Sequence, residues 1–191
     1  PLFGFPDWGY SNLEEVLLYP STFDENHNTS GSGRNISGMV GYGYMNGTMI
    51  LSKKSLRMGY SNTSDKKNVG IHEFAHLIDG FDGAMDGIPK AYFETPGAIP
   101  WIDMINKKTK EILEDESDIN SYGASAPEEF FAVAAEYFFE KPKLLQKKHP
   151  ALYKAMSQAF MQSPLIKTPS SKRTLMPNDR CHCGSGKKYK K

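Results

Sequence analysis

The segment at residues 68–80 constrains this chain more than any other, because it holds the pattern His-Glu-x-x-His within a mostly apolar run. The run predicts a helix that is buried on most sides. Residues four apart lie on one face of a helix, so His72 and His76 can offer their imidazoles to one metal ion. Asp79 falls between them on the same polar stripe, and Glu73 lies beside the position of an attacking water. A polar stripe on a buried helix needs an explanation, and a zinc site is the first hypothesis.

A catalytic zinc takes three protein ligands and keeps one position open, so the motif needs a third ligand. Glu129 opens a second apolar helix that must be buried, and a buried carboxylate is costly unless a partner or a metal compensates its charge. Its neighbour Glu128 is expected to act locally, in a capping box with Ser125. Glu129 is therefore the favoured third ligand, with His149 and His27 as alternatives. The competing hypothesis is that the motif histidines are core residues with ordinary hydrogen-bond partners.

The patterns along the chain predict an α+β fold, with a small mixed sheet, the motif helix and a helical C-terminal half. The expected strands are residues 15–19, 39–44 and 48–52, with a hairpin turn at Asn46-Gly47. The expected helices are residues 99–115, 127–139, 142–147 and 150–161, with a helical turn at 53–57. The inward face of the first of these is expected to hold Trp101, Met104, Ile105, Ile112 and Leu113.

The edge of the predicted sheet has a functional interpretation as well as a structural one. An edge strand beside a metal-binding helix can pair with an extended peptide, which adds the substrate as one more strand. A plain α+β core explains the strands equally well. In the second apolar helix, Glu136 lies two turns beyond Glu129 on the same face.

The net charge of +1 conceals an uneven distribution along the chain. Residues 1–162 carry 15 Lys and Arg against 21 Asp and Glu, whereas residues 163–191 carry 8 against 1. The composition also changes to Pro, Ser, Thr and Lys from residue 163 onward. These shifts predict a folded domain at residues 1–162, a flexible basic linker at 163–177 and a short terminal motif at 178–191.

The composition also bears on the compartment and the partners. No apolar run is long enough to span a bilayer and no signal segment opens the chain, so a cytoplasmic location and no membrane partner are expected. Four Asn-x-Ser/Thr sequons would suit a secreted chain, but chance occurrence in a polar loop region is favoured. The two cysteines, Cys181 and Cys183, are too close together for a mutual disulfide. For the basic tail, a solvated end is favoured over a contact with nucleic acid.

Two separated segments resemble a known family. They are His-Glu-Phe-Ala-His-Leu-Ile-Asp at residues 72–79 and, within residues 122–139, the run Glu-Phe-Phe-Ala-Val-Ala-Ala-Glu-Tyr-Phe-Phe. They resemble the Mlc titration factor A family of zinc peptidases, whose active site is similar to that of lethal-factor-type zincins. The resemblance covers most of residues 13–162 and implies a zincin-like metallopeptidase domain there. It implies zinc ligation by His72, His76 and Glu129, general base catalysis by Glu73 and oxyanion stabilisation by Tyr122.

The implied activity is hydrolysis of a peptide or protein substrate by a zinc metallopeptidase, with the aminopeptidase-type activity described for family members. Zinc would lower the pKa of a water molecule to about 7, and Glu73 would take its proton and return it to the leaving amine. Asp79 is a candidate for holding a ligand histidine. The alternative is a regulatory binding protein, because the namesake of the family sequesters a transcriptional repressor, with zinc mainly structural.

The end of the sequence contains a second recognisable motif. Cys181-x-Cys183-Gly-Ser-Gly-Lys-Lys-Tyr-Lys resembles the zinc-binding SEC-C motif found at the C-terminus of SecA proteins. That motif uses two further ligands after this point, whereas the sequence stops at Lys191. A structural zinc site needs four ligands, so a second zinc ion is expected only if the chain continues past Lys191.

Overall fold

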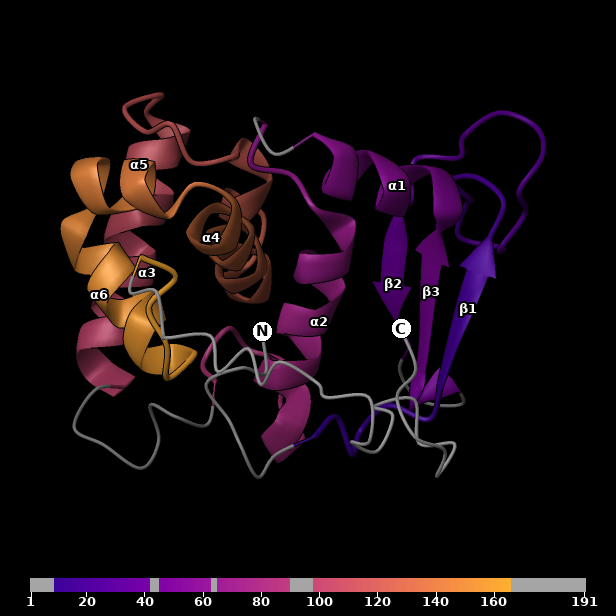
Figure 1. Cartoon of the computed structure of the whole chain (residues 1–191), viewed down its shortest axis with the longest axis horizontal. Helices are drawn as coiled ribbons and strands as arrows, with labels where there is room; N and C mark the ends of the chain where they lie inside the picture. The colour runs from indigo at the N-terminus through magenta and orange to yellow at the C-terminus, as the bar shows by residue number, and fades with distance from the viewer. Residues whose placement is uncertain (1–8, 42–44, 63–64, 90–97, 166–191) are drawn as a thin grey trace, which may run out of the picture.

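The computed structural model describes residues 9–41, 45–62, 65–89 and 98–165. Figure 1 shows these residues as successive layers, with a small sheet on one side, α2 beside it, then α4, and the remaining helices beyond. The motif helix is α2 (Val69–Asp79), and the second apolar helix is α4 (Pro127–Glu140). The expected α+β class is confirmed, and the motif helix lies between the sheet and the helical half.

The sheet has three strands in the order β1-β3-β2. They are β1 (Glu15–Tyr19), β2 (Gly38–Val40) and β3 (Thr48–Ser52). β1 pairs with β3 in parallel and β2 pairs with β3 antiparallel, so the sheet is mixed, as expected. The central strand β3 is almost wholly buried, which explains why its run Met-Ile-Leu is apolar without alternation.

The described part of the second strand is residues 38–40, and positions 42–44 of the expected strand 39–44 lie outside the described residues. The antiparallel pairing expected for a hairpin is confirmed, and the expected turn at Asn46-Gly47 stays a prediction. A Cβ atom on Gly41 would lie 2.3 Å from the carbonyl oxygen of Met45, so only glycine allows this approach. The amide of Gly41 still donates to the carbonyl of Thr48, and this bond closes the pairing with β3.

The expected helical turn after β3 is a full helix, α1 (Lys53–Ser61). Its N-terminus is capped by Ser52, whose hydroxyl accepts a hydrogen bond from the amide of Ser55. The side chains of Leu56 on α1 and Leu77 on α2 join a small apolar cluster that covers the sheet. α1 and α2 thereby hold one face of the sheet against the rest of the domain.

The helical half consists of α4 with α3 (Ala98–Leu113), α5 (Pro142–Lys148) and α6 (Pro150–Ala159), which lie on the side of α4 away from α2. α4 is apolar on nearly every side because it runs through the main hydrophobic core. The expected inward face of α3 is confirmed for Trp101, Ile105 and Ile112, which are buried. Leu113 was wrongly assigned to that face: it is 73% exposed, because it is the last residue of the helix.

Within the described residues, no helix is both long enough and apolar enough to cross a membrane. The predicted linker at 163–177 falls outside the described residues except for its first three positions, and Cys181 and Cys183 lie outside them entirely. The proposed division of the chain into domain, linker and terminal motif therefore stays a prediction.

Candidate metal centre

The metal centre begins with the way α2 starts. Asn68 is its N-cap, and the side-chain oxygen of Asn68 accepts a hydrogen bond from the amide of Ile71. From that start, positions 72 and 76 fall on the same face, one turn apart. The apolar residues on the other faces pack on both sides, with Leu77 toward the sheet and Ala75 in the main core. The polar stripe of α2 is therefore turned toward the first turn of α4.

The structure brings the three expected ligands into one cluster. His72 and His76 lie with their Nε2 atoms 3.2 Å apart. The Oε2 atom of Glu129 is 3.0 Å from Nε2 of His72 and 3.6 Å from Nε2 of His76. Ligand atoms about 2.0–2.1 Å from a tetrahedral zinc ion lie roughly 3.3 Å from one another, so these three spacings fit such an ion.

Glu129 reaches the cluster because of how α4 begins. Pro127 occupies the first turn of the helix, as expected, and Glu129 follows in that turn. The expected capping box is wrong, because the N-cap is Ala126 and no side chain caps the helix. The amide and the hydroxyl of Ser125 both donate to the carbonyl of Tyr122, at the end of the short helix η5 (Ser121–Ala124). The predicted cap therefore does not explain why Glu128 lies outside the cluster.

Glu73 is next to the ligands and 5% exposed. Burial raises the pKa of its carboxyl to about 7, against the opposing effect of the neighbouring His72 and His76. The carboxylate lies against β2, where a Cβ atom on Gly38 would be 2.5 Å from Oε1 of Glu73. The missing side chain at Gly38 therefore makes the space that Glu73 occupies.

Tyr122 lies on the other side of the ligand cluster, in η5. Its ring centroid is 5.9 Å from that of His72, and its side chain is half exposed. Partial burial, and next the charge of Glu129, raise the pKa of the phenol to about 12. The phenol therefore keeps its proton at neutral pH and is a hydrogen-bond donor.

The charges of the cluster suit a cation. Burial opposes ionisation of Glu129, but hydrogen bonds from His72 and His76 outweigh it and lower its pKa to about 2. Burial likewise lowers the pKa of His72, but the carboxylates of Glu129 and Glu136 outweigh this and raise it to about 10. Positive charge is thus strongly stabilised where the three ligand atoms converge.

Glu136 is the residue at this site whose role the sequence did not reveal. Its Oε1 atom lies 2.9 Å from Nδ1 of His72, on the opposite side of the ring from Glu129. The available signal was the seven-residue spacing between Glu129 and Glu136, which places both on one helix face. The distance from that face to α2 depends on tertiary packing and could not be obtained from local patterns.

The other candidates lie elsewhere. His149 is hydrogen-bonded to Asp118, and the ring of His27 stacks on Phe23 in the loop before β2. Neither histidine is part of the three-residue cluster. The wholly buried Asp79 accepts a hydrogen bond from the amide of Gly87, so its described contact is with the following loop. Its expected contact with a ligand histidine stays a prediction.

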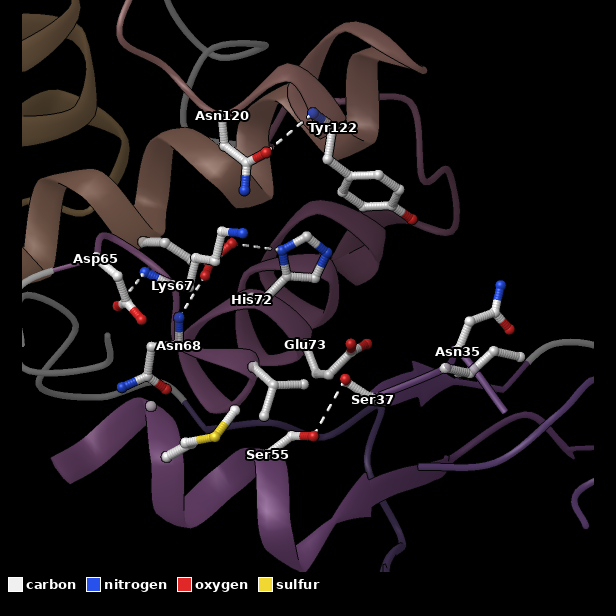
Figure 2. Close-up of a pocket in the computed structure, with 16 residues that line it drawn as sticks. Asn35, Ser37, Ser55, Asp65, Lys67, Asn68, His72, Glu73, Asn120 and Tyr122 are labelled. Carbon is white, nitrogen blue, oxygen red and sulfur yellow. Dashed lines mark hydrogen bonds and ion pairs between the residues drawn. The ribbon is translucent and has the colours of Figure 1, made fainter. Parts of the chain in front are cut away.

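The cluster opens into a cleft of about 560 Å³. Figure 2 shows His72, Glu73 and Tyr122 in this cleft, with the loop of Asp65 and Asn68 along one side. The far wall is formed by α1 and by the start of β2. The start of β2, Glu73 and His72 of the ligand cluster therefore line one cleft.

The sequence model of the glucose-regulated metallo-peptidase M90 family matches residues 1–161, and that of the SEC-C motif matches residues 178–191. Among similar proteins, the uncharacterized protein slr2042 of Synechocystis is 32% identical over 167 residues, covering 82% of this chain and 60% of that protein.

Two further relatives carry a functional name. The Mlc titration factor A of Yersinia enterocolitica is 29% identical, covering 81% of this chain and 61% of its own length. That of Yersinia pestis is 27% identical, covering 87% of this chain and 64% of its own length. The chain therefore spans less than two thirds of the length of these relatives.

Proposed function

This chain belongs to the glucose-regulated metallo-peptidase M90 family, and from that premise we propose that it is a zinc-dependent peptidase whose ion is held by His72, His76 and Glu129. The observation that carries the proposal is the spacing of the three ligand atoms beside a buried carboxylate, Glu73. Imidazole and carboxylate are the donors of catalytic zinc sites, and three of them leave a fourth position for a substrate or water.

The roles of the residues follow from where they lie. When bound, zinc supplies a Lewis acid that polarises the scissile carbonyl and lowers the pKa of a water molecule to about 7. Glu73, with its raised pKa, takes the proton from the attacking water and passes it to the leaving amine. Tyr122, as a protonated phenol, donates a hydrogen bond to the oxyanion that develops on the carbonyl oxygen.

The position of β2 supports a peptide as the substrate. β2 is at one edge of the described sheet, and its first residue, Gly38, lies against Glu73. A peptide in extended conformation that pairs with this edge gains backbone hydrogen bonds and presents its carbonyl groups to the site. Whether the enzyme removes single N-terminal residues, as an aminopeptidase does, is a finer proposal that peptide cleavage patterns decide.

The test is zinc analysis and cleavage of a peptide library by the wild-type chain and by Glu73→Gln in parallel. We expect the variant to keep its zinc and to lose turnover by on the order of 10²- to 10⁴-fold, which is the contribution of a general base. Glu128→Gln is the matched control, because Glu128 is the neighbour of a ligand on α4 but lies outside the cluster. Full activity of Glu73→Gln would contradict the assignment.

The names of two relatives favour one alternative, a regulatory binding protein that sequesters a transcriptional repressor. In that case zinc is mainly structural. The wild-type chain would then retain zinc but cleave neither the library nor chromogenic amino-acid anilides. Glu73→Gln would bind a repressor as tightly as the wild type does.

For the end of the chain, we propose that Cys181 and Cys183 supply two of the four ligands of a structural zinc site of the SEC-C type. The donor atoms of this second site differ from those of the proposed peptidase centre, because thiolates take the place of two imidazoles and a carboxylate.

A further inference from the structure

Glu136 carries a carboxylate that the proposed reaction does not use. It is 5% exposed and lies at the middle of α4, in the main core. Its two oxygens have different partners on α2. Oε1 lies 2.9 Å from Nδ1 of His72, and Oε2 accepts a hydrogen bond from the backbone amide of Asn68, the N-cap of α2. A buried charge with two specific partners calls for a role.

The contact with His72 determines which nitrogen of the ring can bind a cation. A neutral imidazole carries one proton, on either Nδ1 or Nε2, and the other nitrogen presents a lone pair. A carboxylate at Nδ1 keeps the proton there and leaves the lone pair on Nε2. Nε2 is the atom that lies within 3.2 Å of the other two ligand atoms, from His76 and Glu129.

The same contact fixes the rotation of the ring. Glu136 and the N-cap of α2 are tied together, so the carboxylate that orients His72 is itself held by the helix that carries His72. His76 has no comparable support, because its Nδ1 atom has no hydrogen-bond partner among the described residues. His72 is therefore held by a residue that is not itself a proposed ligand, whereas no described residue accepts a hydrogen bond from Nδ1 of His76.

We propose that Glu136 is a positioning residue of the metal centre, which keeps His72 in the form protonated at Nδ1 and aims Nε2 at the cation. The inference rests on the proposed function of this cluster as a zinc site. Carboxylates that accept a hydrogen bond from a ligand histidine typically contribute 10- to 100-fold to metal affinity.

Glu140 provides a matched control on the same helix. It lies one turn beyond Glu136, and its Oε1 atom accepts a hydrogen bond from the side-chain amide of Asn68 at 3.2 Å. Glu140 thus also ties α4 to the start of α2, but it does not touch a ligand histidine. Replacing Glu140 with Ala removes only a link between α4 and Asn68. Replacing Glu136 with Ala removes a link to Asn68 and also the hydrogen-bond partner of His72.

The experiment measures the zinc dissociation constant of the full chain by competition with a chelator. We expect Glu136→Ala to weaken zinc binding about 10- to 100-fold and Glu140→Ala to change it less than about twofold. In Glu136→Gln, a single amide oxygen remains to accept from two donors, the ring of His72 and the backbone amide of Asn68. We therefore expect this variant to lose about tenfold in zinc affinity. Circular dichroism of the metal-free proteins checks that each variant is folded. Nitrogen-15 spectra of the zinc-loaded protein should show a protonated, slowly exchanging Nδ1 of His72 that is lost in Glu136→Ala.

Two results would overturn the inference. One is zinc binding at wild-type affinity in both Glu136 variants. The other is an equal loss of affinity in Glu140→Ala, which would mean that Glu136 acts only by linking α4 to the start of α2. If Glu136→Ala does not fold, the zinc affinity and the Nδ1 signal of Glu136→Gln decide. Failure of the proposed peptidase function is seen separately, as a wild-type chain that binds zinc with the expected dependence on Glu136 but cleaves no peptide.

Discussion

At the scale of single residues, the site is organised by two glutamates that hold one imidazole. Glu129 and Glu136 come from the same face of α4 and approach His72 at Nε2 and Nδ1 respectively. Only Nε2 converges with the other proposed ligand atoms, so Glu129 is placed to bind the cation and Glu136 to support the ring. On the proposed assignment, a single helix face supplies both a metal ligand and the support of another ligand.

Tyr122 gives a prediction at this scale. Tyr122→Phe removes the phenol that is proposed to donate to the oxyanion and leaves the three ligands unchanged. We expect kcat/KM to fall by on the order of 10²-fold, as for the loss of one oxyanion donor, with an unchanged zinc content. Steady-state kinetics together with metal analysis measure both quantities.

The control for this prediction is Tyr60→Phe, on the exposed side of α1. It removes a similarly exposed phenol that does not line the cleft. Wild-type kinetics in Tyr122→Phe, or a parallel loss in Tyr60→Phe, would contradict the assigned role.

At the scale of elements, the close approach of β2 and α2 decides where Glu73, the proposed general base, lies. Gly38 opens the short strand β2, and the carboxylate of Glu73 occupies the space that a side chain at this position would fill. The strand that is proposed to guide the substrate therefore also positions the proposed base. On this proposal, the contact of Gly38 with the Glu73 side chain sets the substrate relative to the base.

Gly38→Ala tests this contact. The added Cβ atom would lie 2.5 Å from Oε1 of Glu73 and 2.6 Å from Cγ2 of Val69, so the carboxylate must move. A misplacement of about 1 Å can lower the rate by on the order of 10²-fold, and we expect a fall in kcat of that size at unchanged zinc affinity.

Gly9→Ala serves as the comparison, because a Cβ atom there meets nothing within 4 Å. Kinetics and zinc titration of the two variants separate displacement of the base from loss of the metal. Gly38→Ala with a wild-type kcat would show that the contact does not set the position of Glu73.

The elements also show how far local sequence patterns reach. α2 and α4 were predicted from apolar runs and from Pro127, because these signals act within one or two turns. The close approach of Gly41 to Met45 was not predicted, since no local pattern pairs these residues. The capping box was wrong because η5, which is stabilised by its own hydrogen bonds, already uses Ser125.

The same limit applies to the candidate site. The i, i+4 spacing of His72 and His76 is a property of one helix, so it could be read from the sequence. The contact of Glu136 with His72 joins residues that are 64 positions apart and depends on how two helices pack. Pairing between distant elements is the part of a site that single-sequence patterns do not contain.

At the scale of the whole molecule, one carboxylate joins the segment before α2 to the helical half. Asp118 accepts hydrogen bonds from the ring of His149 at 2.8 Å and from the hydroxyl of Tyr137 at 2.8 Å. Its Oδ2 atom also lies 3.1 Å from the ammonium groups of Lys66 and Lys148. Because Lys66 lies just before α2, this cluster fixes the start of α2 to α4 and to the C-terminal helices.

The cluster predicts how the stability of the domain depends on pH. Burial alone would raise the pKa of Asp118, but the hydrogen bonds from His149, Tyr137, Lys148 and Lys66 outweigh it and hold the pKa well below its usual range. A carboxyl group whose pKa is lower in the folded state than in the unfolded state binds fewer protons when folded. Its contribution to stability is therefore present above the unfolded pKa of about 3.9 and is lost as the pH falls toward the folded value.

Asp118→Asn tests this dependence in the metal-free protein, where zinc binding does not add to the measured stability. We expect the variant to lose about 1.5–3 kcal/mol of unfolding free energy at pH 7, the range for hydrogen bonds to a charged group. The difference from the wild type should stay constant down to about pH 5 and shrink between about pH 4 and pH 2. Urea unfolding at a series of pH values measures it, with Asp103→Asn on the exposed face of α3 as the control. A difference that is unchanged at pH 2 would mean that Asp118 acts through its shape and not through its charge.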